Sequence, residues 1–120
     1  MNCDFGFYST NNRNINLPLK DALFRGLAED GGLYLPREIP LMPASFFNEL
    51  PTSNYTRMAF VLAKHLIGNT VPDDALESIV NDSFNFPVPL VEVKPNRYAL
   101  ELFHGPTLSF KDFGARFMAR

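Results

Sequence analysis

The fold is decided by residues 100–120, which read Leu-Glu-Leu-Phe-His-Gly-Pro-Thr-Leu-Ser-Phe-Lys-Asp-Phe-Gly-Ala-Arg-Phe-Met-Ala-Arg. An apolar strand here leads through a His-Gly-Pro-Thr turn into the start of a helix. Ser109 and Asp112 have the spacing of a capping box, which predicts Ser109 as the N-cap and Asp112 as the third helical residue. Behind that cap, the residues at helical spacing that predict a buried face are Phe110, Phe113, Gly114, Phe117 and Met118.

Lys111 lies off this apolar face, at the second residue of the predicted helix. The helix macrodipole disfavours a cation there by about 0.3–1 kcal/mol at an exposed site. Lys111 therefore has no structural reason to stand beside a glycine turn. An amine that is kept partly neutral is what Schiff-base chemistry needs, so Lys111 is the candidate catalytic residue.

The composition predicts one modest core and no surface for nucleic acid or membranes. The 120 residues are 46% hydrophobic and include twelve Phe, which suffices for such a core. A net charge of −2 gives no basic face for nucleic acid or an anionic membrane. The single cysteine, Cys3, excludes an internal disulfide, and the sequence shows no signal-peptide core or membrane-length apolar run. We therefore expect a soluble, cytoplasmic protein.

The C-terminal apolar pattern is still in phase at Arg120, with no capping glycine or terminal proline after it. Helices in α/β proteins normally lead into a following strand. We therefore expect the chain to be the N-terminal piece of a longer enzyme.

The N-terminal half predicts short strands and short helices. Weak alternation predicts a strand within residues 3–10, and Asn16 is placed to cap a helix. Residues 30–32, Asp-Gly-Gly, form a turn signal before a brief strand at 33–35, and we interpret that signal as backbone geometry. The expected apolar helix contacts are Leu19, Ala22, Leu23 and Leu27 in the first helix and Phe46, Phe47 and Leu50 in the next.

The C-terminal half predicts two longer helices and a hairpin. Ser53 is placed to cap the clearest helix and Gly68 to end it, and another helix begins after Pro72, a residue favoured at the first helical position. Strands at 90–93 and 98–103 are most simply a hairpin. The apolar faces are Tyr55, Met58, Ala59, Leu62, His65 and Leu66 in the first helix and Leu76, Ile79, Val80 and Phe84 in the second.

Two polar features each have a structural and a functional interpretation. His65 lies on a packing face, which favours a half-buried structural residue over a ligand. Asp73 and Asp74 fit the first turn of a helix, where the dipole favours acids, better than a catalytic dyad. No Cys/His spacing indicates a metal site, and the Walker, G-x-G-x-x-G and G-x-S-x-G motifs do not occur.

Two separate blocks of the sequence resemble the threonine synthase family. Residues 103–112, Phe-His-Gly-Pro-Thr-Leu-Ser-Phe-Lys-Asp, resemble its pyridoxal-phosphate lysine segment, and residues 109–115 resemble more loosely the Ser-Phe-Lys segment of threonine dehydratases. Residues 7–10, Phe-Tyr-Ser-Thr, and residues 26–36, Gly-Leu-Ala-Glu-Asp-Gly-Gly-Leu-Tyr-Leu-Pro, resemble the N-terminal segment typical of threonine synthases and absent from dehydratases. The order and spacing of these blocks fit across nearly the whole chain.

The resemblance implies the α/β fold of type II pyridoxal-phosphate enzymes, in which two lobes hold the cofactor between them. This chain would be the N-terminal part of that fold, a helix-rich segment with short strands followed by a β-hairpin that leads into the lysine-bearing helix. We expect a threonine-synthase-type N-terminal domain at residues 1–88 and the truncated start of the cofactor-binding core at residues 89–120.

The resemblance also implies a reaction. Lys111 would hold pyridoxal 5'-phosphate as a Schiff base, and the full enzyme would convert O-phospho-L-homoserine and water to L-threonine and phosphate. The family's cofactor-phosphate loop and its groups for the pyridine ring are expected in the missing C-terminal part of the same enzyme. We therefore expect the 120-residue chain alone to bind the cofactor weakly and to be inactive.

Five residues near the lysine match the family segment but also have structural interpretations. Thr107 and Ser109 have hydroxyls that either contact the cofactor or substrate or serve turn and cap. His104 is either a turn residue or a catalytic one. Phe110 and Asp112 match the family motif but are interpreted first as packing and capping residues.

Two other functions stay open at this point. One is a threonine-synthase-like phospho-lyase, which eliminates phosphate from a related amino acid and releases a keto acid. The other is a naturally short, cofactor-free binding or interaction domain that keeps the segment without its chemistry. The products formed from O-phosphohomoserine, and the presence or absence of cofactor absorbance, distinguish the three functions.

Overall fold

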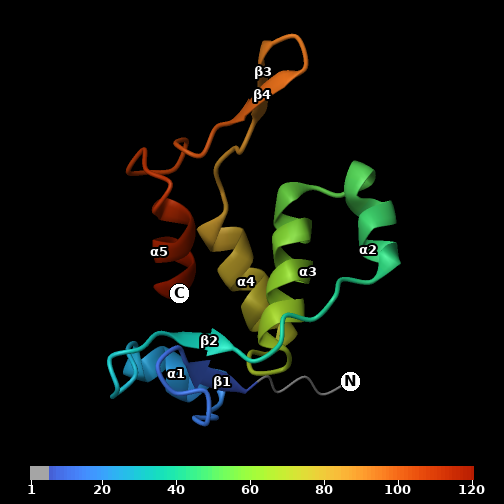
Figure 1. Ribbon diagram of the computed structural model, residues 1–120. Coiled ribbons are helices and arrows are strands. Elements are labelled where there is room, and N and C mark those ends of the chain that lie inside the picture. The colour runs from blue at the N-terminus through green and yellow to red at the C-terminus, as the bar shows by residue number, and fades with distance from the viewer. Residues whose placement is uncertain (1–5) are drawn as a thin grey trace.

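The computed structural model describes residues 6–120 and has the predicted α/β order of elements (Figure 1). A helix-rich segment with short strands comes first, and a hairpin then leads to the lysine-bearing segment. The hairpin projects from one end, and the molecule measures 48 × 31 × 29 Å. The elements are β1 (Phe7–Ser9), α1 (Leu19–Arg25), β2 (Tyr34–Pro36), α2 (Ala44–Glu49), a 3-10 turn η1 (Leu50–Thr52), α3 (Tyr55–Ile67), α4 (Asp73–Ser83), β3 (Leu90–Lys94), β4 (Arg97–Leu100) and α5 (Asp112–Met118).

The N-terminal unit is a small antiparallel pair of strands with one helix against it. β1 pairs with β2, with Tyr8 opposite Leu35, and Leu17 forms a further bridge to Phe7. The predicted strand at 3–10 is therefore shorter in the structure, and its first three residues lie outside the described part of the chain. The buried apolar residues of this unit are Leu17, Ala22 and Ala28.

The prediction that Asn16 caps the first helix was wrong. α1 follows Pro18 in extended conformation and has no side-chain cap. Asn16 Oδ1 instead accepts a hydrogen bond from Arg37 Nε at 3.0 Å. Arg37 also donates to the Arg13 and Ile15 carbonyls, so its guanidinium gathers the loop before α1 and leaves the asparagine no role in the helix.

Helices α3 and α4 pack against each other and carry the main core. Leu76 and Val80 of α4 are 0% and 1% exposed, as their helical spacing predicted. α3 ends at Gly68, whose φ of 61° suits glycine, so that prediction is confirmed. His65 is half-buried, and its Nε2 lies 3.0 Å from the Leu41 carbonyl oxygen, in agreement with a structural role.

The residues that cap α3 and α4 differ from the prediction by one position. Asn54 caps α3 by accepting a hydrogen bond from the Arg57 backbone N–H at 2.8 Å. Ser53, the predicted cap, is instead the C-cap of η1, because its N–H donates to the Glu49 and Leu50 carbonyls. α4 begins after Pro72, as predicted, with Pro72 as its N-cap and not its first helical residue.

The hairpin of β3 and β4 is antiparallel, as predicted, with Leu90 opposite Leu100 and a register shift between Glu92 and Lys94. It follows α4 through a proline-containing segment and is the part of the described chain farthest from β1 and β2 (Figure 1). Its strands deliver the chain to the turn that precedes α5. The apolar side chains that the hairpin exposes are Leu90, Val91, Val93, Tyr98 and Leu100.

Candidate functional site

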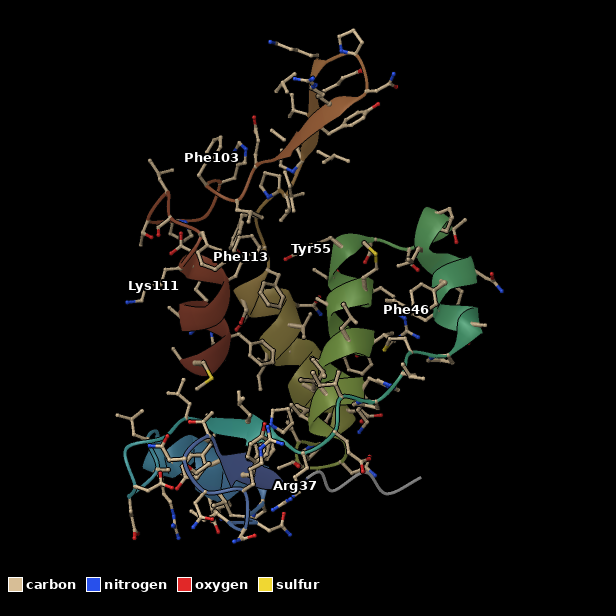
Figure 2. All side chains as sticks on the ribbon, viewed as in Figure 1. Arg37, Phe46, Tyr55, Phe103, Lys111 and Phe113 are labelled. Carbon is tan, nitrogen blue, oxygen red and sulfur yellow. The ribbon has the colours of Figure 1, made fainter. Side chains whose placement is uncertain are left out.

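Lys111 lies immediately before α5, in right-handed helical conformation at φ −60° and ψ −22°. The prediction that it is the second residue of the helix was therefore wrong by two positions. Its side chain is exposed and points outward from α5, whereas Phe113 points toward the helical core (Figure 2). Within residues 6–120, the Lys111 amine takes part in no hydrogen bond or ion pair. The chain thus presents a primary amine that has no hydrogen-bond or ion-pair partner in its described part.

The predicted capping box between Ser109 and Asp112 does not form. Ser109 Oγ accepts a hydrogen bond from the Lys111 backbone N–H at 3.2 Å, and the Ser109 carbonyl accepts one from the Asp112 N–H at 3.0 Å. Ser109 therefore closes a tight turn before the helix, and α5 itself has no side-chain cap. The Ser109 hydroxyl hydrogen remains available to a group outside this turn.

The carboxylate of Asp112 binds Thr107 at two points. Thr107 Oγ1 donates to Asp112 Oδ1 at 2.7 Å, and the Thr107 backbone N–H donates to Oδ2 at 2.9 Å. Asp112 is only 5% exposed. The hydrogen bond from the Thr107 hydroxyl is the largest cause that lowers the pKa of Asp112 below its ordinary value. Burial acts in the opposite direction, and the backbone hydrogen bonds lower the pKa further. The residue is therefore a charged acceptor that is committed to the turn.

Two features show how tightly this turn is built. A Cβ on Gly105 would lie 2.8 Å from Asp112 Cβ and 2.9 Å from its Cγ, so only glycine fits there. Leu108 has a φ of 56°, in the left-handed region that costs a branched residue about 1–2 kcal/mol. Such strain persists only where the surroundings over-determine it, and it is enriched at functional sites.

His104 lies where the hairpin ends and the turn begins. Its Nε2 is 2.7 Å from Glu101 Oε2, and its ring stacks on Phe103 with centroids 4.7 Å apart. The pair is half-buried and holds the imidazole in a fixed orientation. One ring nitrogen is engaged, and Nδ1 has no hydrogen-bond partner within residues 6–120, so both the turn and the catalytic interpretation of His104 stay predictions.

Arg116 fastens α5 to the end of α4. Its Nε donates to the Ser83 carbonyl at 3.0 Å, and its Nη2 donates to the Asp82 carbonyl and to Asn85 Oδ1. The guanidinium also lies 5.8 Å from the Phe86 ring centroid. A cation against the last carbonyls of a helix satisfies groups that the helix itself leaves unpaired. The position of the lysine segment is therefore tied to α4.

Aromatic rings complete the attachment of α5. Phe84 contacts Phe117 in a stacked arrangement at 5.9 Å and Phe113 at 6.2 Å between centroids. Phe110 does not join them: it precedes the helix and is 70% exposed, so its place on a buried face was a wrong prediction. Met118 is likewise 63% exposed.

An apolar groove remains open between α3 and α5, with a volume of about 540 Å³. Phe84 forms part of its wall, and Gly114 leaves open space where a side chain would stand. The remaining lining residues are Tyr55, Met58, Ala59, Leu62, Ala63, Leu66, Ile67, Phe113 and Phe117. Apolar surface is therefore exposed at this end of the chain, although α5 itself is formed and packed.

The structure thus gathers Thr107, Ser109 and Lys111 in one turn, as their closeness in sequence required. The sequence reasoning missed the pairing of Thr107 with Asp112 and the fastening role of Arg116. Gly105 was the available signal for the first, since a glycine permits a close approach of the backbone to another group. Nothing in the sequence pointed to Arg116.

Comparison with known proteins decides the family. The family profile described as threonine synthase N terminus matches residues 6–84, well over half of the chain. The chain belongs to the threonine synthase family. The matched range runs from β1 to the Phe84 ring that holds α5, and it ends before the lysine segment.

Individual threonine synthases align over nearly the whole chain. The threonine synthase of Haemophilus influenzae is 40% identical over 113 residues, which cover 94% of this chain and 26% of that protein. The Escherichia coli threonine synthase is 34% identical, with the same coverage. The alignments therefore extend past residue 84 through the lysine segment, and the chain spans about a quarter of the length of these curated relatives.

Solved threonine synthase structures share the fold. The crystal structure of the Escherichia coli threonine synthase gives a TM-score of 0.89 at 34% identity, over 95% of this chain and 27% of that one. The crystal structure of the threonine synthase from Brucella melitensis, described as PLP bound, gives a TM-score of 0.89 at 37% identity over 96% and 26%. No helix within residues 6–120 has the length and apolar character needed to cross a bilayer.

Proposed function

We propose that the full-length protein carrying this chain is a pyridoxal-phosphate-dependent threonine synthase, and that Lys111 is the residue that binds the cofactor covalently. The reaction would convert O-phospho-L-homoserine and water to L-threonine and phosphate. One observation carries the proposal: the family match lies on the same chain as an exposed, unpaired lysine in a strained turn, within the segment that resembles the family's lysine motif.

The described residues fit this cofactor. Covalent attachment needs an accessible amine, and Lys111 Nζ is exposed without a competing partner in the described part of the chain. The Ser109 hydroxyl can donate a hydrogen bond to an oxygen of the bound group, because within the turn it serves only as an acceptor. The Thr107 hydroxyl donates its hydrogen bond to Asp112, which leaves it only acceptor capacity for a ligand. Ser109 is therefore the better of the two candidate contacts.

Pyridoxal phosphate supplies the electron sink on which the reaction at the amino-acid carbons depends. The chain's own contribution would be to hold the cofactor at Lys111 Nζ, and to use the same Nζ to carry protons whenever substrate frees it. Ser109 would orient the cofactor beside that amine. The backbone turn between Gly105 and Lys111 would fix where the amine stands.

The remaining groups of the site, the second lobe of the type II fold and the substrate's phosphate contacts would come from the missing C-terminal part of the same enzyme. The chain of 120 residues alone would therefore form no threonine. The protein would work in the cytoplasm. The single cysteine of these 120 residues can form no disulfide among them, which suits a reducing compartment.

The test is to locate the cofactor in the purified full-length protein. Reduction with borohydride followed by peptide mass spectrometry is expected to place a pyridoxyl-phosphate adduct on the peptide that contains Lys111. Lys111→Ala should remove the visible cofactor absorbance and lower threonine formation by more than about 100-fold. Lys94→Ala is the matched control, since Lys94 is an exposed lysine on the projecting hairpin, and it should retain both.

Each alternative has its own result. An adduct on a different lysine would refute the assignment of Lys111. Release of a keto acid and ammonia from O-phosphohomoserine, with Lys111 loaded, would make the protein a phospho-lyase of the same family. A full-length protein that binds no cofactor at all would favour the binding-domain function.

A further inference from the structure

Asp112 and Lys111 are neighbours in sequence but opposite in environment. The lysine is exposed and has no partner within residues 6–120, whereas the aspartate is 5% exposed and has both carboxylate oxygens engaged. Both of those oxygens bind one residue, Thr107, at 2.7 and 2.9 Å. The carboxylate therefore closes a ring of backbone whose ends are Thr107 and Asp112, and Lys111 is the last residue inside it.

Closing this ring requires a strained backbone conformation at one of its residues. Leu108, the second residue of the ring, is held in the left-handed region, at a cost of about 1–2 kcal/mol. Its N–H donates to the Gly105 carbonyl at 3.0 Å, and Gly105 lies against the Asp112 side chain at a distance that admits no Cβ. Charge-assisted hydrogen bonds of the kind that Asp112 accepts are about twice as strong as neutral ones. They are the contacts available to offset the strain at Leu108.

The amine depends on this ring for its direction. No contact within the described residues holds Lys111 Nζ, so the backbone at Lys111 and the packing of α5 determine where it points. Misplacement of a reacting group by about 1 Å can lower a rate by about 100-fold. A relaxed ring would therefore impair the chemistry at the lysine even though the lysine itself is intact.

We propose that Asp112 is a positioning residue for the reaction: its carboxylate, by clamping Thr107, sets the turn from Gly105 to Lys111 and thereby the place of the Lys111 amine. The inference rests on the proposed function for its effect on catalysis. The clamp itself is a property of this chain and can be measured without the cofactor. Asp112 touches neither cofactor nor substrate in this role.

The first experiment follows hydrogen exchange in the cofactor-free full-length protein. In Asp112→Ala, backbone amides in the peptide spanning residues 104–112 should exchange at least about tenfold faster, because the Thr107 N–H loses its acceptor. The peptide of α4 should be unchanged. Asp21→Asn, which alters an exposed acid of α1 outside both peptides, is the control and should leave both peptides unchanged. Unaltered exchange at 104–112 would overturn the clamp.

The second experiment uses the cofactor-loaded enzyme and a double-mutant cycle. Asp112→Ala should lower kcat by about 10–100-fold with less than about threefold change in KM, and should weaken the circular dichroism of each bound cofactor molecule. Thr107→Val should have a similar effect alone and little further effect in the Asp112→Ala background. Additive effects would overturn the proposal, because they would mean that Thr107 acts on the cofactor independently of Asp112.

Other outcomes separate this proposal from the proposed function. If Lys111→Ala keeps the cofactor, the proposed function fails, and the exchange experiment still decides whether the clamp exists. If Lys111 holds the cofactor but Asp112→Ala leaves both exchange and kcat unchanged, the positioning role alone fails. Should Asp112→Ala not fold, Asp112→Asn, which keeps one acceptor oxygen, replaces it with the same expected direction and a smaller size.

Discussion

At the scale of single residues, Asp30 illustrates how one carboxylate organises the start of the chain. Its Oδ1 accepts hydrogen bonds from Ser9 Oγ at 2.7 Å and from the Gly32 N–H at 2.9 Å. Ser9 is fully buried, and its Oγ also accepts the Asn11 N–H. The Ser9 hydroxyl foremost, and then the Gly32 N–H, lower the pKa of Asp30 from its ordinary value. The turn at 30–32 is thus more than backbone geometry, because a side chain joins it to β1.

Asp30→Asn is expected to lower the stability of the chain near neutral pH and much less in acid. A carboxyl whose pKa is lowered on folding stabilises the fold above its unfolded pKa of about 3.9, and this contribution is lost as the pH falls through the folded value. Urea unfolding near pH 7 and near pH 3 measures the difference. Asp21→Asn, an exposed acid of α1, is the control. A deficit of equal size at both pH values would contradict this account.

At the scale of elements, the sequence predicted where helices lie better than how they begin. The spacing of apolar residues and the glycine at 68 located α3 and α4, because both signals are local. Ser53 and Asn54 are both residue types that cap helices well. The preceding η1 decides between them, because Ser53 serves as its C-cap. Strands β1 and β2 were predicted as separate pieces, but their pairing depends on contacts between distant residues.

The candidate site divides in the same way. The accessible lysine and its two neighbouring hydroxyls could be located from residue types and from the family resemblance. Spacing alone could not decide whether the capping box forms, because Ser109 and Thr107 are both near enough in sequence to bind the Asp112 carboxylate. The left-handed conformation of Leu108 brings Thr107 within reach, and no residue-type rule predicts that conformation for leucine.

Asn54→Ala should destabilise the chain by about 1 kcal/mol, because the Arg57 N–H would lose its side-chain acceptor at the start of α3. Ser53→Ala is the matched control and should change the free energy of unfolding by less than about 0.5 kcal/mol. Urea unfolding monitored by far-ultraviolet circular dichroism compares the two. A larger effect of Ser53→Ala would restore the serine as the cap.

At the scale of the whole molecule, the described chain leaves much apolar surface uncovered. The open groove between α3 and α5 is lined almost entirely by apolar side chains, and Leu62 and Leu66 on its wall are 40% and 44% exposed. A hollowed, exposed apolar surface of this kind favours association with another apolar surface. The chain spans about a quarter of the length of its curated relatives, and the expectation that follows concerns the isolated 120 residues.

The isolated 120-residue chain is therefore expected to self-associate through this groove. Leu66→Glu places a charge on the wall and should weaken the association at least about tenfold, which corresponds to about 1.4 kcal/mol. Leu41→Glu is the control, since Leu41 is 94% exposed and lies outside the groove. Sedimentation velocity over a range of concentrations measures the effect. A wild-type chain that stays monomeric throughout would refute the expectation.

The contact between Arg116 and the end of α4 has a consequence for exchanging parts between relatives. The guanidinium contacts the backbone carbonyls of residues 82 and 83 and the side chains of Asn85 and Phe86, so the lysine segment is oriented by the preceding part of the chain. A chimaera joined between residues 88 and 89 would pair an arginine from one parent with a helix end from the other. Recombination that keeps α4 and α5 from the same parent should preserve the geometry around Lys111, and a junction between them should not.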